Sequence, residues 1–182
     1  MLKPTDHYTW VEYGNLFYAE RDFDRANERY RKAIAINPKS FRAQANIGRG
    51  ELIRGDFAAA LEASRKALAC VPSDPVILKQ VAWLLAAAPE DKLRDGREAL
   101  RLIESIPQDP RHVDIQWQEV HAAALAEMGR FDDAIAASQR AVDAAESIRS
   151  KRLDDLRSQL TRYQAQQPWR IRSSTRLTAA RP

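Results

Sequence analysis

Three histidines and one cysteine are the side chains of this 182-residue chain that could most readily bind a metal or attack a substrate. His7, His112 and His121 lie far apart, and none stands in an H-x3-H spacing or beside a paired carboxylate. We therefore expect each to be structural, with His121 satisfied by a neighbouring backbone or side-chain group. Cys70 lies in an apolar stretch, where a small buried side chain is expected. A single cysteine also excludes an internal disulfide framework and a cysteine-based zinc site.

The sequence contains none of the common catalytic motifs. It has no glycine-rich phosphate loop, no G-x-S-x-G elbow and no H-E-x-x-H zinc motif. Its acidic pairs, Asp132 with Asp133 and Asp154 with Asp155, stand near predicted helix starts, where the helix dipole favours carboxylates. The prediction is a protein that is not an enzyme and that uses no cofactor and no metal.

The composition is that of an ordinary globular protein with a small basic excess. Hydrophobic residues make up 45%, and 29 lysines and arginines exceed 25 acidic residues, so the net charge is +4. Only six glycines argue against an all-β design. The most apolar stretch, residues 76–89, is interrupted by Lys79 and Gln80 and is too short to span a membrane. The N-terminus does not read as a secretory signal, so we expect a cytoplasmic protein.

An internal repeat with a period of 34 residues organises the sequence. Identical residues recur at this spacing: Gly14 and Gly48, Asp22 and Asp56, Phe23 and Phe57, Ala26 and Ala60, Ala33 and Ala67, Pro38 and Pro72. Such a period indicates stacked supersecondary units. Within the first unit, Trp10, Tyr13, Gly14 and Phe17 form one stripe of a helix, with the glycine where a neighbouring helix must approach closely. Ser40 is predicted to cap the helix that opens the second unit.

These positions resemble the tetratricopeptide repeat, whose pattern begins W-x2-L-G-x2-Y and continues with small and aromatic residues and a proline. The resemblance implies an all-α fold, a right-handed α-solenoid of four helix-turn-helix units plus a C-terminal capping helix. We expect the solenoid over 7–167, with repeats at about 7–40, 41–74, 75–113 and 115–147, a capping helix at about 150–166, and a basic tail at 168–182. The run 82–89, followed by about five extra residues around 89–94, resembles a bacterial subgroup with a lengthened turn in the third repeat.

The same resemblance implies a protein-interaction module that holds a partner in a groove lined by the first helices. The groove positions that we expect to bind the partner are Tyr8, Asn15, Tyr18, Arg42, Arg49, Lys79 and Trp83. Further positions carry acids at the far end, at Glu119 and Glu127. Aromatic residues and arginines are enriched in interface hot spots, so the expected partner is a protein or peptide segment with acidic and apolar character. The alternative is that Trp83 packs between helices and that the arginines form a solvated face.

The last fifteen residues carry the basic excess of the whole chain. Removing Arg170, Arg172, Arg176 and Arg181 from the 29 basic residues leaves 25, equal to the number of acids. One alternative function is therefore binding of an anionic surface or nucleic acid by this tail, although its charge density is below that expected of a nucleic-acid arm. A second alternative is an architectural subunit whose apolar faces pair with copies of itself.

Overall fold

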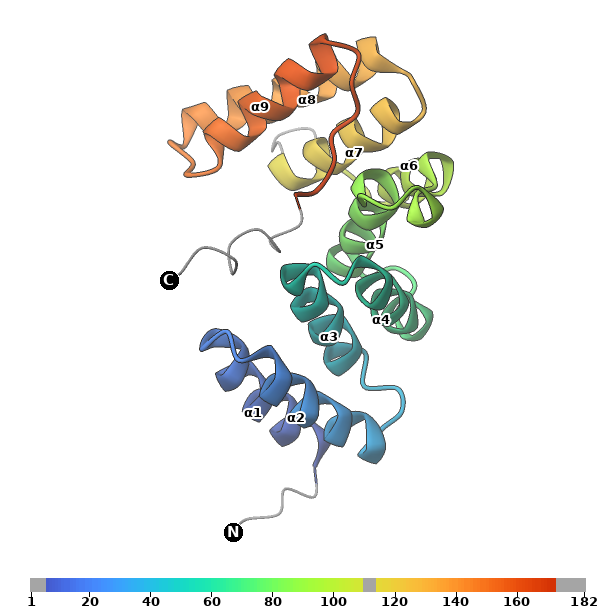
Figure 1. Ribbon diagram of the computed structural model, residues 1–182, viewed down its shortest axis with the longest axis vertical. Coiled ribbons are helices and arrows are strands. Elements are labelled where there is room, and N and C mark those ends of the chain that lie inside the picture. The colour runs from blue at the N-terminus through green and yellow to red at the C-terminus, as the bar shows by residue number, and fades with distance from the viewer. Residues whose placement is uncertain (1–5, 110–113, 173–182) are drawn as a thin grey trace, which may run out of the picture. The chain divides into compact units, whose positions relative to one another are not determined.

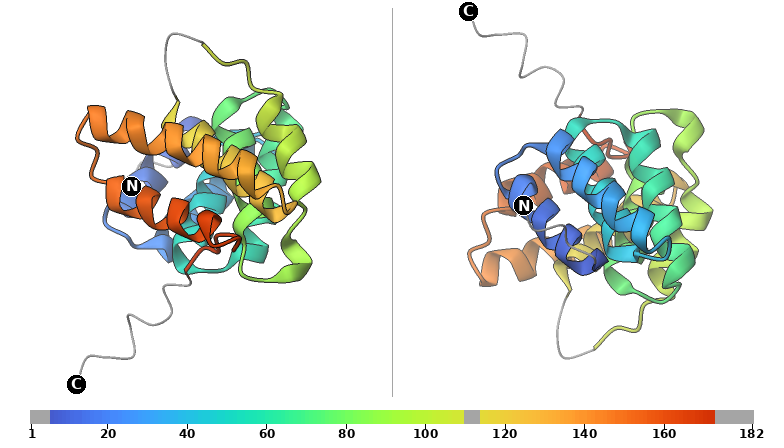
Figure 2. Two further views of the ribbon diagram at one scale, coloured as in Figure 1. Left: turned by 90° about the horizontal axis from the view of Figure 1, so that it is seen from above. Right: turned by 90° about the horizontal axis from the view of Figure 1, so that it is seen from below.

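The computed structural model describes residues 6–109 and 114–172, and these residues form two compact units (Figures 1 and 2). Unit 1 comprises the described residues up to Ile77, and unit 2 those from Leu78 to Arg172. The described residues contain nine α-helices, one short 3-10 helix and no strand. The helices are α1 (His7–Ala19), α2 (Phe23–Ile36), α3 (Phe41–Arg54), α4 (Phe57–Cys70), α5 (Pro75–Ala87), α6 (Gly96–Glu104), α7 (Ile115–Glu127), α8 (Phe131–Ser147) and α9 (Leu153–Gln164). The predicted all-α fold is confirmed.

Unit 1 is built from two helix pairs, in which α1 packs against α2 and α3 against α4, while α2 also packs against α3. Its core contains Val11, Ala26, Tyr30 and Ala33. Gly14 permits the contact within the first pair, because a Cβ atom at this position would lie 2.6 Å from Cδ1 of Tyr30. The glycine of the sequence stripe therefore stands where α2 packs closely against α1.

Aspartates cap most of the helix starts. Asp22 and Asp56, which are one repeat apart, accept the backbone N–H groups of Arg25 and Ala59 at 3.1 and 3.0 Å. Asp6, Asp95 and Asp114 do the same for α1, α6 and α7. These bonds satisfy amides that have no acceptor within the helix.

Ser40 departs from the pattern of helix caps. It occupies the N-cap position of α3, as predicted, but its hydroxyl makes no capping hydrogen bond. The side chain is buried instead, at 3% exposure.

Unit 2 contains most of α5, together with α6 to α9 and the residues that follow α9. The connection between α5 and α6 covers residues 88–95 and includes the 3-10 helix Asp91–Leu93, whereas residues 20–22 are enough to join α1 to α2. In this unit α7 packs against α8, and α8 against α9, around a cluster that includes Val142, Leu156 and Leu160. No helix of the described ranges has the length and apolar character needed to span a membrane.

The chain folds back after α9 instead of leaving unit 2. Residues 168–172 form an extended segment, coloured dark red in Figure 1, in which the N–H of Ile171 donates to the carbonyl oxygen of Ala87 at 2.8 Å. Trp169, Arg170 and Ile171 are partly buried. We refer to residues 168–172 as the C-terminal strap.

Candidate partner-binding faces

In unit 1, the helices α1 and α3 bring five of the predicted groove residues into one region. Tyr8, Asn15 and Tyr18 lie on α1, and Arg42 and Arg49 lie on α3. The guanidinium carbon of Arg49 is 5.5 Å from the centre of the Tyr18 ring, which is close enough for a cation–π contact. Both arginines are exposed, and so is Tyr8. We call these five residues the Tyr18–Arg49 face.

Within this face, partly buried Asn15 links three helices by hydrogen bonds. Its Oδ1 accepts from the hydroxyl of Tyr30 at 3.0 Å and from Nδ2 of Asn46 at 2.8 Å, and its Nδ2 donates to Glu12. One amide therefore joins α1, α2 and α3. Burial raises the pKa of Tyr30 to about 12, so this phenol stays a hydrogen-bond donor at neutral pH.

In unit 2, Lys79 is engaged within the fold. Its Nζ lies 2.8 Å from Oδ2 of Asp114, and its side chain is only 13% exposed. Burial by itself would raise the pKa of Asp114, but the hydrogen bonds from Lys79 and from the backbone N–H of Trp117 lower it overall. The charge of Lys79 is therefore compensated by a residue that sequence reasoning did not connect to it.

Trp83 lines a cavity of about 260 Å³ in unit 2, together with Glu119, Arg152, Asp155, Ser158, Gln159, Trp169, Ile171 and Arg172. Glu119 is the buried anion of this site, at 4% exposure. Both of its carboxylate oxygens accept from Nη2 of Arg152, at 2.6 and 2.7 Å, and Oε1 also accepts from Gln159 at 2.8 Å. A buried carboxylate needs such partners, because desolvation of an unpaired charge is costly. The sequence placed Glu119 among the groove positions but did not identify Arg152 as its partner.

The first residues of the predicted basic tail, 168–172, form the C-terminal strap of unit 2. Nη2 of Arg170 lies 2.7 Å from Oε2 of Glu127, whose other oxygen accepts from Nε of Arg94 at 2.9 Å. Arg170 thus belongs to the folded unit, because a half-buried carboxylate from α7 binds it. Arg172 is exposed, with its guanidinium 5.7 Å from the centre of the Trp169 ring. The other two predicted tail residues, Arg176 and Arg181, lie outside the described residues.

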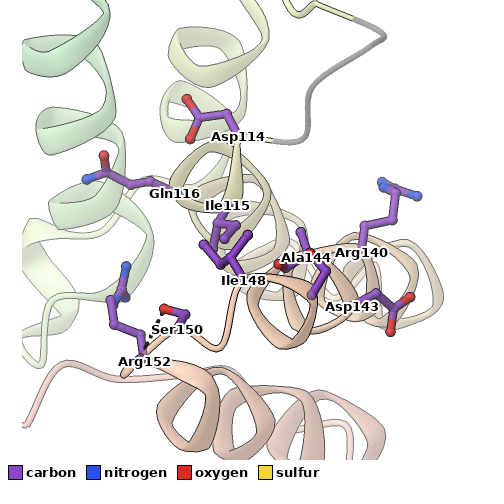
Figure 3. Close-up of a pocket in the computed structure, with 10 residues that line it drawn as sticks. Asp114, Ile115, Gln116, Arg140, Asp143, Ala144, Ile148, Ser150 and Arg152 are labelled. Carbon is purple, nitrogen blue, oxygen red and sulfur yellow. Dashed lines mark hydrogen bonds between the residues drawn. The ribbon is translucent and has the colours of Figure 1, made fainter.

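A larger open pocket, of about 710 Å³, lies where α7 begins and α8 ends (Figure 3). Ile115 and Ile148 lie next to each other at its centre, and Ile148 is 67% exposed. Arg140 and Asp143 lie on one side of the isoleucines and Arg152 on the other (Figure 3). The sequence did not predict this pocket, because Ile148 follows the last turn of α8, where the helical pattern has ended.

Of the residues first considered for chemistry, His112 lies outside the described residues, and Cys70 is partly buried rather than fully buried. The described part of the chain contains no group of three or more His, Cys, Asp or Glu side chains that could hold a metal. His121 stacks on Trp117, with ring centres 4.5 Å apart, and its Nε2 lies 3.3 Å from Glu104. Burial lowers the pKa of His121. This histidine has the side-chain partner that the sequence analysis expected.

Comparison with known proteins identifies the repeat. Residues 13–75 match the family model of the tetratricopeptide repeat. No curated protein matches the chain. A solved tetratricopeptide repeat protein from Parabacteroides merdae ATCC 43184 superposes with a TM-score of 0.71 at 16% identity, over 90% of this chain and 61% of that one. The chain thus spans about three fifths of that protein's length.

Two further solved proteins have a similar length to this chain. MamA from Desulfovibrio magneticus RS-1 superposes with a TM-score of 0.66 at 13% identity, covering 91% of this chain and 97% of its own. YrrB, described as a TPR protein with an unusual peptide-binding site, gives a TM-score of 0.65 at 15% identity and 88% coverage of both chains. At such identities the likeness establishes the fold alone.

Proposed function

Because this chain is a tetratricopeptide repeat protein, we propose that it is a non-enzymatic interaction module that holds a segment of a partner protein on its first helices. We assign the four repeats to about 7–40, 41–74, 75–113 and 115–147, since the pairs α1–α2, α3–α4, α5–α6 and α7–α8 fall within these ranges. A peptide-binding site is reported for the similar fold of YrrB. That precedent supports peptide binding here as well. The lengthened turn in the third repeat as a mark of a bacterial subgroup stays a prediction.

The Tyr18–Arg49 face is the proposed binding site for an acidic and apolar segment. The observation that carries this proposal is that Arg49 is exposed while its guanidinium rests on the ring of Tyr18. An arginine held in this way presents free N–H groups to a carboxylate with little loss of side-chain freedom. Arg42 lies two turns earlier on α3, and Tyr8 offers an exposed ring 55% open to solvent. Together they provide two cations and two aromatic contacts for an extended chain.

We expect the two predicted groove residues of unit 2, Lys79 and Trp83, to contribute less to partner affinity. Lys79 already binds Asp114, and Trp83 shares its cavity with the C-terminal strap. A partner that bound there would have to compete with contacts already made. We therefore place the main affinity in unit 1.

The test uses two fluorescent 12-residue peptides, one with alternating glutamate and leucine or phenylalanine, the other with lysine in place of glutamate. We expect the acidic peptide to bind the full chain more tightly by fluorescence anisotropy. Arg42→Gln with Arg49→Gln should weaken it at least tenfold, about 1.4 kcal/mol, which is the scale of a charge-assisted hydrogen bond. Arg65→Gln with Lys66→Gln, which likewise removes two positive charges from exposed positions of α4, is the matched control. Equal affinity for the two peptides, or binding that the double variant leaves unchanged, would contradict the proposal.

The two alternatives have less support from the described contacts. Arg170 is already bound to Glu127, which leaves one described arginine of the tail, Arg172, exposed for an anionic surface. Arg172→Gln together with deletion of 173–182 tests that role, because loss of salt-dependent binding to a nucleic acid would favour it. Sedimentation of the purified chain tests self-association.

A further inference from the structure

A second surface of unit 1, on another side of α1, carries an aromatic stripe. Trp10, Tyr13 and Phe17 follow one another along the helix, with ring centres 6.2 and 5.3 Å apart. Leu16 extends the stripe. Tyr13 is 42% exposed and Leu16 63% exposed. At 100° per residue this stripe lies far around the helix from Tyr8 and Asn15, so it is distinct from the Tyr18–Arg49 face.

Three cations of α2 lie over the stripe. Arg29 is 5.0 Å from the centre of the Tyr13 ring and 5.5 Å from that of Phe17, and Lys32 is 4.9 Å from Trp10. Arg25 is 5.0 Å from Phe17. The spacing of these cations at i, i+4 and i+7 places them on one side of α2. We call the seven residues the aromatic–cation face: Trp10, Tyr13, Leu16, Phe17, Arg25, Arg29 and Lys32.

The cations of this face are only partly neutralised. Asp22 binds Arg25 at 2.6 Å, and Glu28 is shared between Arg29 at 2.7 Å and Lys32 at 3.0 Å. Two carboxylates thus serve three cations. The Nε–H of Arg29 has no acceptor within the described ranges. The face therefore has an apolar centre and one positive charge in excess.

The second repeat shows which structural element packs on the equivalent surface of its first helix. One period later, the corresponding surface of α3 is covered by α2: a Cβ on Gly50 would lie 3.6 Å from Phe23, and Glu51 accepts from Asn27 at 2.6 Å. Gly50 corresponds to Leu16 in the first repeat, and Glu51 corresponds to Phe17. Leu16 and Phe17 of the aromatic–cation face are thus equivalent to the positions of α3 on which the helix α2 packs.

The chemistry of the two equivalent surfaces differs, and this difference indicates the partner. Phe17 cannot accept the bond that Glu51 accepts from Asn27, so a copy of α2 would lose its polar contact. The sequence of α2 also carries four basic residues, which the cations of the face would repel. Aromatic residues and arginine, by contrast, are enriched in interfaces with other proteins. A helix flanked by acids would match both the apolar centre and the charge.

We propose that the aromatic–cation face docks an amphipathic helix of another protein, whose apolar stripe is flanked by glutamate or aspartate. The stripe packs on Tyr13 and Leu16, and the acids approach Arg25 and Lys32 at the edges. This surface is separate from the Tyr18–Arg49 face. The chain then joins two partners, an extended segment on one face and a helix on the other.

The test uses two synthetic 24-residue helices with leucine at i, i+3, i+4 and i+7 spacing, flanked in one peptide by glutamate and in the other by lysine. Binding to the full chain is followed by fluorescence anisotropy and by hydrogen exchange of α1 and α2. We expect the acidic helix to bind at least tenfold more tightly and to protect α1 and α2. Tyr13→Ser with Leu16→Ser, and separately Lys32→Glu, should each weaken it at least tenfold.

Matched controls come from equivalent positions. Lys66 stands one repeat after Lys32 and is likewise paired with a glutamate, Glu62, so Lys66→Glu should leave the binding unchanged. Val76→Ser removes an exposed apolar side chain elsewhere and should also have no effect. Arg42→Gln with Arg49→Gln should spare this binding, which separates it from the function proposed above.

Three results would overturn the inference. The first is equal affinity for the acidic and basic helices. The second is binding that survives both Tyr13→Ser with Leu16→Ser and Lys32→Glu while circular dichroism shows the variants folded. The third is a dimer in sedimentation that the Tyr13 and Leu16 substitutions dissociate, because a second copy would then be the occupant.

Discussion

Alanine at position 14 should destabilise unit 1, although alanine is the better helix former. The added Cβ would lie 2.6 Å from Cδ1 and 3.0 Å from Cζ of Tyr30. Tyr30 has no exposed surface, and its hydroxyl is bound to Asn15. The ring is thus fixed at both ends, so α1 and α2 must move apart to admit one methyl group.

The expected magnitude follows from two opposing effects. Replacing glycine by alanine inside a helix is worth about 1 kcal/mol in favour of folding. Overpacking a close-packed site costs about 1–3 kcal/mol. Since the contact with a rigid ring is below 3.0 Å, we place the cost at the upper end. The net loss for Gly14→Ala is therefore about 1–2 kcal/mol in the free energy of unfolding.

Gly50 provides the opposite control in the same unit. A Cβ at this position would lie 3.6 Å from Phe23 and 3.7 Å from Asn27, which are ordinary contacts. Gly50→Ala should therefore gain stability, by up to about 1 kcal/mol. The same substitution, glycine to alanine, is thus expected to lower the free energy of unfolding at one buried helical position and to raise it at the other.

The assay is urea unfolding followed by circular dichroism, with hydrogen exchange of α1 to α3 as a local measurement, because two compact units need not unfold in one step. Gly14→Ala should lower the urea midpoint and accelerate exchange in α1 and α2. If Gly14→Ala were as stable as the unmodified chain, or if both variants shifted in the same direction, the packing argument would be refuted.

Three further predictions concern unit 2. Tyr163→Phe should cost less than about 0.5 kcal/mol in a urea titration, because the buried hydroxyl has no hydrogen-bond partner within the described ranges; a loss above about 1 kcal/mol would reveal one. Glu127→Gln should lower the free energy of unfolding by about 1–3 kcal/mol, because two arginines bind this carboxylate. Arg172→Gln is the control and should leave the urea midpoint unchanged. If the two variants lowered the midpoint equally, a structural role for Arg170 would be contradicted. Burial lowers the pKa of His121 below 6.5, so its protonation disfavours the folded state: stability is complete above pH 6.5 and falls as the pH drops toward the folded pKa. His121→Gln should reduce that fall between pH 7 and 5 in thermal melts, and an unchanged slope would argue against it.

Much of the fold could be predicted because its determinants are local and repeat every 34 residues. Asp22 and Asp56 are the same cap one repeat apart, and the role expected for Gly14 matches its contact with Tyr30. Ser40, which makes no capping hydrogen bond, shows the limit of such local determinants. A serine before a helix is a local signal, and it cannot tell whether the hydroxyl reaches an amide or turns into the core.

The side-chain contacts of unit 2 could not be predicted from the repeat, because the residues that make each contact are distant in sequence. Arg152 and Glu119 are 33 residues apart, and Gln159 binds the same carboxylate from 40 residues away. No period connects these positions. Composition likewise could not show that Arg170, within the predicted tail, forms an ion pair with Glu127.

This difference changes how the basic excess of the chain should be interpreted. Arg170 adds to the net charge of the chain, but its own charge is paired with that of Glu127 within unit 2. In unit 1, by contrast, the exposed Arg49 rests on the ring of Tyr18, which attracts a cation through its quadrupole without cancelling its charge. A cation held in this way stays available to a carboxylate and is already positioned for it. Attraction for acidic partners therefore depends less on the net charge of +4 than on where aromatic rings support the cations, and both proposed faces of unit 1 meet that condition.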